Sequence, residues 1–531
     1  MAITDTRPDV EAADGSADDQ VHEPSGLIGL LGTGDHKAIG QLYIGFSLLF
    51  GLVALVGAGL ARLENVGDGG VLPEDTAFQV FQLSELALVF LVALPLFVGL
   101  AIHLVPLQIG ASTIAFPRAA ALSLWTWLAG SITLMVAYAL NGGVGGGGQR
   151  ATELSYLALI VVLVGLLLAS VCIATTVMTL RTPGMTLDRA PMFTWGMLVA
   201  TAAWLLTLPV LIANIVIAYL NHHNGGITFT AVGDDDWPLL VWAVILPQVY
   251  VLAVPVLGAL GDAVPTLAEV RQPWRGVVLS GIGAFGALSI GAWAQPAQGG
   301  EVWAEPLFIF VSFAIVVPVL ACLGPWASAI GAGRAKLHAP LAIGMVAMVV
   351  LLVAALAGAL YAVEPFQVQS VMLPEYGVPV GALGQSNLVI ATAITGALAS
   401  LFFWGPKITG RTLPEGLGKV VAPIALLGGL AWGIAPVVQG FQAEFEGLAD
   451  ADDPLTIVSV AGAGLLALAA LVTVVALVRA SSGPNAADDP GGGGQTLEWA
   501  TTCPPPRGNF GELAPVRSPE PLLDAADEEG S

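Results

Sequence analysis

Twelve long stretches of this 531-residue chain are apolar and nearly free of charge, and they constrain its fold more than any other feature. A helix needs about 20 apolar residues to cross a bilayer. With 56% hydrophobic and only 11% charged residues, the chain has too little charge to cover a soluble protein of this length. We predict an all-α polytopic membrane protein with twelve transmembrane helices, near 39–62, 82–108, 118–141, 154–180, 192–220, 237–261, 276–297, 306–331, 339–362, 378–404, 420–441 and 455–478.

The basic residues give the orientation of these helices. With the N-terminus inside, 15 of the 17 lysines and arginines lie on the inner side, and only Arg62 and Arg150 lie outside. Basic residues favour the cytoplasmic side, so both termini are predicted to be cytoplasmic. We divide the chain into an acidic N-terminal tail with a short interfacial segment (1–36), the twelve-helix domain (37–480) and a Gly/Pro-rich C-terminal tail (481–531).

The net charge of −22 lies in the tails and outer loops, for example at 234–236 and 444–453. Nucleic acid is not an expected partner, because phosphate contacts need basic residues. The acidic loops fit either solvated loops suited to high salt or a docking face for a basic partner. The three cysteines show no disulfide or metal spacing, and the acidic N-terminus lacks the pattern of a cleaved signal.

Short motifs along nearly the whole chain resemble subunit I of the haem-copper (cytochrome c) oxidases. They lie at 35–37 with 39–43, at 104–111 with 115–118, at 191–195, at 404–411, and at 496–501 with 504–506. In that family these segments belong to the start of the first helix, the end of the second, the start of the fifth, the end of the tenth and the tail. The resemblance implies a twelve-helix bundle with both termini inside.

The resemblance also implies six histidines inside the membrane, which hold two haems and a copper. The positions that correspond to them hold Ser84, Leu246, Gln295, Pro296, Gly384 and Ser386. Imidazole nitrogen is the usual ligand of such metals, so we predict that this chain binds neither haem nor copper. The family's proton-path residues are also replaced, by Gln248, Thr113 and Cys322, its outer His-Asp pair by Tyr376 and Gly377, and its propionate-binding arginine pair by the sequence at 444–446.

The histidine count leads to the same expectation without the family. The chain has six histidines, and only His103 lies within a predicted span, near its inner end. Two axial ligands on facing helices cannot be assembled from this set. The adjacent His222 and His223 fit either a surface metal site or a solvated polar turn.

Three further residues are of interest, and two of them, Glu85 and Tyr250, keep two interpretations each. Glu85, beside the lost ligand position, is either an interfacial carboxylate that meets water or a buried acid of an ion pathway or partner contact. Tyr250, where the family has its active-site tyrosine, is either a packed tyrosine with a satisfied hydroxyl or a residue with a remaining function. His103 is expected to hydrogen-bond at the inner end of its helix.

Three functions follow from these observations. The first is a non-catalytic paralogue of oxidase subunit I that acts as a cofactor-free scaffold in a larger respiratory or redox complex, because fold and function are separable. The second is an ion or proton conduit that uses Glu85, and the third is a terminal oxidase subunit with unconventional ligands. The resemblance implies subunit II-like and III-like membrane partners and lipid, in the plasma membrane of a prokaryote.

Overall fold

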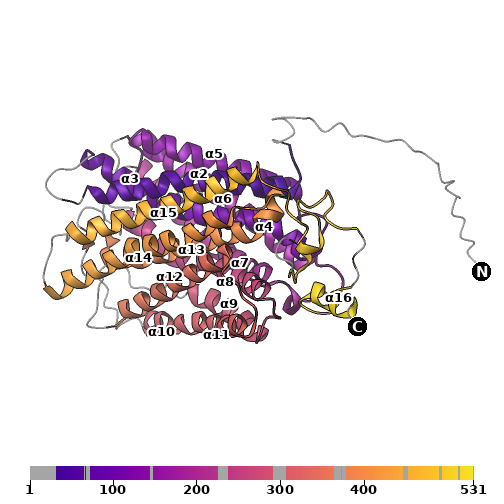
Figure 1. The fold of residues 1–531 in the computed structure, drawn as a ribbon. Coiled ribbons are helices and arrows are strands. Elements are labelled where there is room, and N and C mark those ends of the chain that lie inside the picture. Colours follow the sequence, from indigo (N-terminus) through magenta and orange to yellow (C-terminus); the bar gives the residue numbers. More distant parts are fainter. Residues whose placement is uncertain are drawn as a thin grey trace, which may run out of the picture. The chain divides into compact units, whose positions relative to one another are not determined.

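The computed structural model describes residues 32–64, 66, 72–143, 148–224, 237–290, 306–363, 372–373, 378–446, 453–489, 493–511, 513 and 515–529. Gly34–Ser531 is one compact unit, in which long helices run side by side (Figure 1). The longer elements are α2 (His36–Leu63), α3 (Glu74–Ala87), η1 (Leu88–Ala93), α4 (Leu94–Gln108), α5 (Pro117–Ala139), α6 (Gln149–Thr179), α7 (Met192–His223), α8 (Trp237–Leu267), α9 (Arg275–Ser289), α10 (Pro306–Ala314), α11 (Val316–Ala332), α12 (Ala339–Tyr361), α13 (Val380–Thr409), α14 (Glu415–Glu446) and α15 (Asp453–Ala480).

Short elements complete the described chain. These are η2 (Leu187–Arg189), η5 (Leu497–Ala500), α16 (Pro521–Glu529) and an antiparallel pair of strands, β1 (Met372–Leu373) and β2 (Val378–Pro379). We call the end of the bundle at which α2 begins and α4 ends the proximal end, and the opposite end the distal end. Helix α16 lies at the proximal end (Figure 1), and η5 contacts both α4 and α16.

The described residues confirm an all-α polytopic membrane protein. They contain 11 helices that are long and apolar enough to cross a membrane. The seventh predicted span, 276–297, is the one not among these 11: it begins as the 15-residue apolar helix α9, and most of its remainder lies outside the described residues. The cytoplasmic location of the termini stays a prediction.

Three segments form the centre of the bundle. The apolar windows of Thr76–Gln108 and Val380–Thr409 are 100% buried and that of Tyr250–Leu267 is 94% buried, whereas those of the peripheral spans are 39–56% buried. The peripheral helices leave large apolar side chains exposed, as a lipid-facing surface does. Helices α3, η1, α4 and α13 are therefore surrounded by protein, and three of the lost ligand positions lie on them.

The π-helical turn η1 leaves one backbone carbonyl without a hydrogen-bond partner in its own helix. In a π-helix each N–H donates to the carbonyl five residues earlier, and the N–H of Leu94 does so to Val89. Pro95 follows without an N–H, so the carbonyl of Phe90 lacks its partner within the helix. The indole N–H of Trp127 on α5 donates to this oxygen at 3.0 Å. A side chain from another helix thus satisfies the backbone group, as the apolar interior requires.

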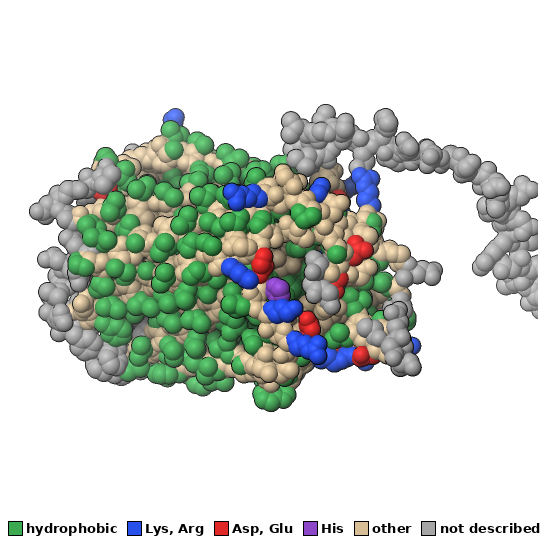
Figure 2. All heavy atoms as spheres, viewed as in Figure 1, with side chains coloured by type: hydrophobic (Ala, Val, Ile, Leu, Met, Phe, Trp, Pro, Cys, Tyr) green, Lys and Arg blue, Asp and Glu red, His purple; other side chains and the backbone are tan. Residues whose placement is uncertain are grey.

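The C-terminal segment, which we define as residues 493–511, packs against the proximal end of the bundle. Leu497, Glu498, Trp499 and Asn509 are buried there. On the face that Figure 2 shows, charged side chains gather mainly at this end, and apolar side chains cover most of the remaining described surface. Part of the predicted tail is thus a packed element of the bundle.

Replacing Trp127 with Phe tests the cross-helix bond. The ring still packs on Tyr43 and Phe50, but the buried carbonyl of Phe90 loses its donor. We expect a loss of about 1–3 kcal/mol in the free energy of unfolding, the cost of an unsatisfied buried polar group. Thermal unfolding in detergent measures it. The control, Trp274→Phe, changes an indole that is 66% exposed and should leave the transition unchanged; equal effects would contradict the interpretation.

Candidate functional site

The candidate site lies on the central helices, at the lost ligand positions. Ser84, on α3, is buried, and its Oγ donates to the carbonyl of Val80 in the same helix at 2.6 Å. A Cβ added to Gly57 of α2 would lie 2.6 Å from the same Oγ. The hydroxyl is therefore used within its helix and covered by α2, and it is not a normal ligand for haem iron or copper.

On α13, Gly384 lies at a position that the sequence resemblance assigns to a ligand histidine. A Cβ built there would lie 2.6 Å from the carbonyl oxygen of Gly433 and 2.7 Å from the amide nitrogen of Val437, both on α14. The backbones of α13 and α14 thus meet at this point, and no side chain of any size fits between them. Ser386, two residues further along α13, is buried, and among the described residues its Oγ has no hydrogen-bond partner.

The side chains at the other lost ligand positions lie outside the described residues. Leu246 lies on α8, but the side chains of 237–249 are outside the described set. Gln295 and Pro296 lie outside the described residues, as do Tyr376 and Gly377. The substitutions at these positions therefore rest on the sequence alone.

Tyr250 of α8 is a packed tyrosine with a satisfied hydroxyl, the first of its two interpretations. It is buried, and its Oη is hydrogen-bonded to Nε2 of Gln385, the residue between Gly384 and Ser386. Its ring meets Phe285 edge to face at a centroid distance of 6.0 Å. Both polar groups abut Gly358 of α12, where any Cβ would collide with them. Three helices thus close on the hydroxyl that the family uses beside its metals.

Glu85 is not the water-exposed interfacial carboxylate of its first interpretation, because its side chain is only 4% exposed. Its Oε2 has no hydrogen-bond partner among the described residues. Arg62 of α2, also buried, supplies a favourable charge interaction. A buried carboxylate near one arginine fits the second interpretation, that of a functional acid or a partner contact, better than a solvated residue.

Sequence reasoning missed a buried polar cluster at the proximal end. Asp262, at the end of α8, accepts the N–H groups of Met192 at 2.7 Å and Phe193 at 3.0 Å, at the start of α7. Gln108 joins two carboxylates, donating to Asp262 at 3.0 Å and to Glu498 at 3.1 Å. A lone aspartate at the end of an apolar span was the available signal, but its partners are 69 to 154 residues away in sequence.

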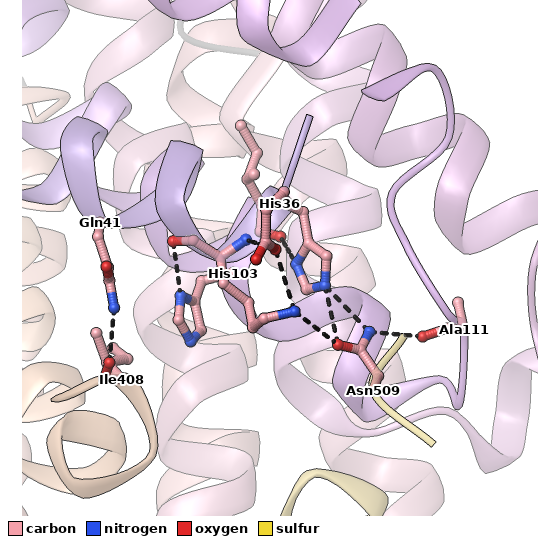
Figure 3. A network of polar contacts seen from close by, with 9 residues as sticks. His36, Gln41, His103, Ala111, Ile408 and Asn509 are labelled. Atoms are coloured by element: carbon pink, nitrogen blue, oxygen red, sulfur yellow. Dashed lines mark hydrogen bonds and ion pairs between the residues drawn. The ribbon is translucent and has the colours of Figure 1, made fainter. Parts of the chain in front are cut away.

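The hydrogen bond predicted for His103 is present: its Nδ1 lies 3.1 Å from the carbonyl of Lys37 (Figure 3). Less expected is His36, which is 1% exposed and lies between α4 and the C-terminal segment. His222 and His223 face Tyr156, Tyr219 and Glu153 at the distal end. In the described part of the chain, no three His, Cys, Asp or Glu side chains come together so that they could hold a metal.

These features define a class of protein: a polytopic helical bundle whose central segments carry positions that the sequence resemblance assigns to oxidase metal ligands. The pattern of the family "Cytochrome C and Quinol oxidase polypeptide I" matches residues 38–463. A Streptomyces avermitilis protein named as a cytochrome c oxidase subunit 1-beta is 30% identical over 525 residues, which cover 94% of this chain and 92% of the relative.

Two further similar proteins are also named as cytochrome c oxidase subunit 1. A subunit 1-beta of Streptomyces coelicolor is 32% identical, with 93% of this chain and 89% of the relative covered. A Corynebacterium efficiens protein named "Cytochrome c oxidase subunit 1" is 28% identical over the same shares of the two chains. The chain therefore belongs to the cytochrome c and quinol oxidase polypeptide I family, as its motifs predicted.

Replacing Gly384 with Ala tests the close contact of α13 and α14. The added methyl group meets backbone atoms that cannot rotate away. We expect a loss of about 1–3 kcal/mol in the free energy of unfolding, typical of overpacking. The matched control is Gly464→Ala on α15, where a Cβ meets nothing within 4 Å; it should be neutral or stabilising by up to about 1 kcal/mol. Thermal unfolding of both variants measures the two changes in stability. Equal stability of the two variants would contradict the close contact of α13 and α14.

Proposed function

We propose that this chain is a cofactor-free, non-catalytic paralogue of cytochrome c oxidase subunit I that serves as a membrane scaffold in a larger respiratory or redox complex. The observation that carries the proposal is the packing at Gly384, where two helix backbones occupy the place of a ligand side chain. Oxygen reduction needs redox centres, and a haem or copper needs nitrogen or sulfur donors at fixed depth.

The described donor set does not fit the family's metals. Ser84 and Ser386 offer only hydroxyls, and Gly384 offers no side chain. The two imidazoles nearest the spans, His36 and His103, are both bound to backbone carbonyls at the proximal end. Tyr250 is bound to Gln385, as expected of a tyrosine that packs without a metal neighbour. Each feature supports a bundle in which side-chain packing has replaced cofactors.

The partners follow from this scaffold role. The peripheral helices present exposed apolar side chains, which fit lipid and other membrane-spanning subunits. We propose that subunit II-like and III-like proteins are among them and that the complex lies in the plasma membrane, in line with the bacterial relatives.

The absence of cofactors is testable on the purified native complex. We expect no haem Soret band that belongs to this chain and no stoichiometric iron or copper, measured by optical and elemental analysis. Repeating both measurements on the isolated chain separates it from haem proteins that copurify. A reduced-minus-oxidised spectrum with haem bands from the isolated chain would contradict the scaffold and favour an oxidase with unconventional ligands.

The buried Glu85 favours one alternative, an ion or proton conduit. Its unpartnered oxygen in the apolar interior is typical of residues that move ions. As a scaffold, the chain in proteoliposomes should pass ions no faster than empty vesicles, and Glu85→Gln should change nothing. Flux above background in the unaltered chain, lost in Glu85→Gln but retained in Glu64→Gln, would replace the scaffold with the conduit.

A further inference from the structure

The junction between His36 and the C-terminal segment joins residues 473 positions apart in sequence. His36 is 1% exposed and Asn509 is 1% exposed, so water does not reach their contact. Figure 3 shows His36, His103 and Asn509 gathered at the proximal ends of α2 and α4. The C-terminal segment therefore docks on the bundle through a buried imidazole.

The partners of His36 define its protonation. Nδ1 lies 2.9 Å from the carbonyl oxygen of Ile102, and a carbonyl only accepts, so Nδ1 carries a hydrogen. In the neutral ring Nε2 is then an acceptor. The amide nitrogen of Asn509 lies 3.0 Å from Nε2 and can donate one hydrogen to it.

The other bonds of Asn509 agree with this arrangement. Its second amide hydrogen goes to the carbonyl of Ala111 at 2.8 Å, and its Oδ1 accepts from Nζ of Lys37 at 3.2 Å. With His36 neutral, every donor in this set meets an acceptor. Docking is then complete without a charge on the ring.

Protonation of His36 breaks this match. A hydrogen on Nε2 would face the donating nitrogen of Asn509 at 3.0 Å. Its one alternative acceptor there, Oδ1 at 3.2 Å, already receives the Lys37 ammonium. Two cations would then converge on a single neutral oxygen in a buried place, where desolvation already penalises charge.

The surrounding charges do not remove this conflict. Among the described carboxylates, Asp35 is the one whose charge acts on His36, and it is paired with Nζ of Lys37 at 3.1 Å. Burial raises the pKa of Asp35, but hydrogen bonds from Lys37 and the charge of Lys37 outweigh burial, and the net pKa is lowered. From α4 comes the second imidazole, His103, at a ring-centroid distance of 6.4 Å, and a charge on it would add repulsion.

We propose that the C-terminal segment is an acid-released latch: it docks on the proximal end when His36 is neutral and detaches when His36 takes up a proton. Docking and protonation compete, so docking is complete above the pH at which a free imidazole titrates, about 6.5, and is lost as pH falls below it. Detachment would uncover Gln108 and Trp404, which donate to Glu498 of the segment.

The test uses the full chain in lipid nanodiscs with a nitroxide on the segment. Thr502→Cys places the label at an exposed position, and Cys503→Ser removes the half-buried thiol, while Cys172 and Cys322 remain buried. Electron paramagnetic resonance spectra between about pH 8 and about pH 5 then report how mobile the segment is. We expect the ratio of released to docked segment to rise by up to about tenfold per pH unit, the limit for one proton.

Two substitutions assign the effect to His36. His36→Gln keeps an acceptor for Asn509 but cannot be charged, so its segment should stay docked across the range. Asn509→Asp offers a carboxylate to both Lys37 and a protonated His36, so acid should tighten rather than release its segment. The Asp variant keeps the test decisive if His36→Gln does not fold.

Two control substitutions test whether another histidine causes the acid release. His338→Gln, at a residue exposed on another loop, should behave like the unaltered chain. His103→Gln should also keep the acid release. A segment whose mobility does not change with pH, or acid release that survives His36→Gln, or release abolished by His103→Gln alone, would overturn the proposal.

Discussion

The bilayer provides no water to a buried polar group, and each part of this structure meets that constraint in its own way. Backbone groups are satisfied within helices, and where Pro95 interrupts the pattern, Trp127 of another helix supplies the missing donor. At the proximal end, where apolar helices stop, the open N–H groups of Met192 and Phe193 are satisfied by Asp262. Exceptions remain among the described residues: Oε2 of Glu85 and Oγ of Ser386 are buried without a hydrogen-bond partner, and the buried carboxylate in particular needs a functional explanation.

The central helices show how a family fold can persist where its ligands are missing. A large void in the middle of a bundle is costly, so loss of a cofactor must be accompanied by closer packing. Gly384 and Gly433 let α13 and α14 meet at the backbone, and Gly358 lets Tyr250 and Gln385 come together against α12. Small residues are the usual means of such close contact between membrane helices. Our proposal of a scaffold rests on this packing together with the missing imidazoles.

The C-terminal segment is a packed part of the bundle's proximal end. Its composition suggests a linker and a tail, yet Glu498 and Asn509 are buried and bonded to α4, α13 and α2. Lys407, fully buried, donates to the carbonyl of Thr501, which ties the same segment to the end of α13, and also to the carbonyl of Asp488, which precedes the segment. The segment therefore covers the helix ends, and a protonation event at His36 has a structural consequence because it lies beneath this cover.

The sequence by itself determined the class of fold, the spans, the family and the absence of imidazole from the middle of the spans, because apolar length and residue identity are local properties. It also predicted the bond of His103. It could not reveal that Glu85 is buried, that Gly384 lies against a backbone, or that His36 meets Asn509, since these depend on which helices become neighbours. Contacts between residues hundreds of positions apart, such as Gln108 with Glu498, exist only after the helices have packed. Tertiary structure alone decided them, because burial and hydrogen-bond partners are properties of the assembled bundle.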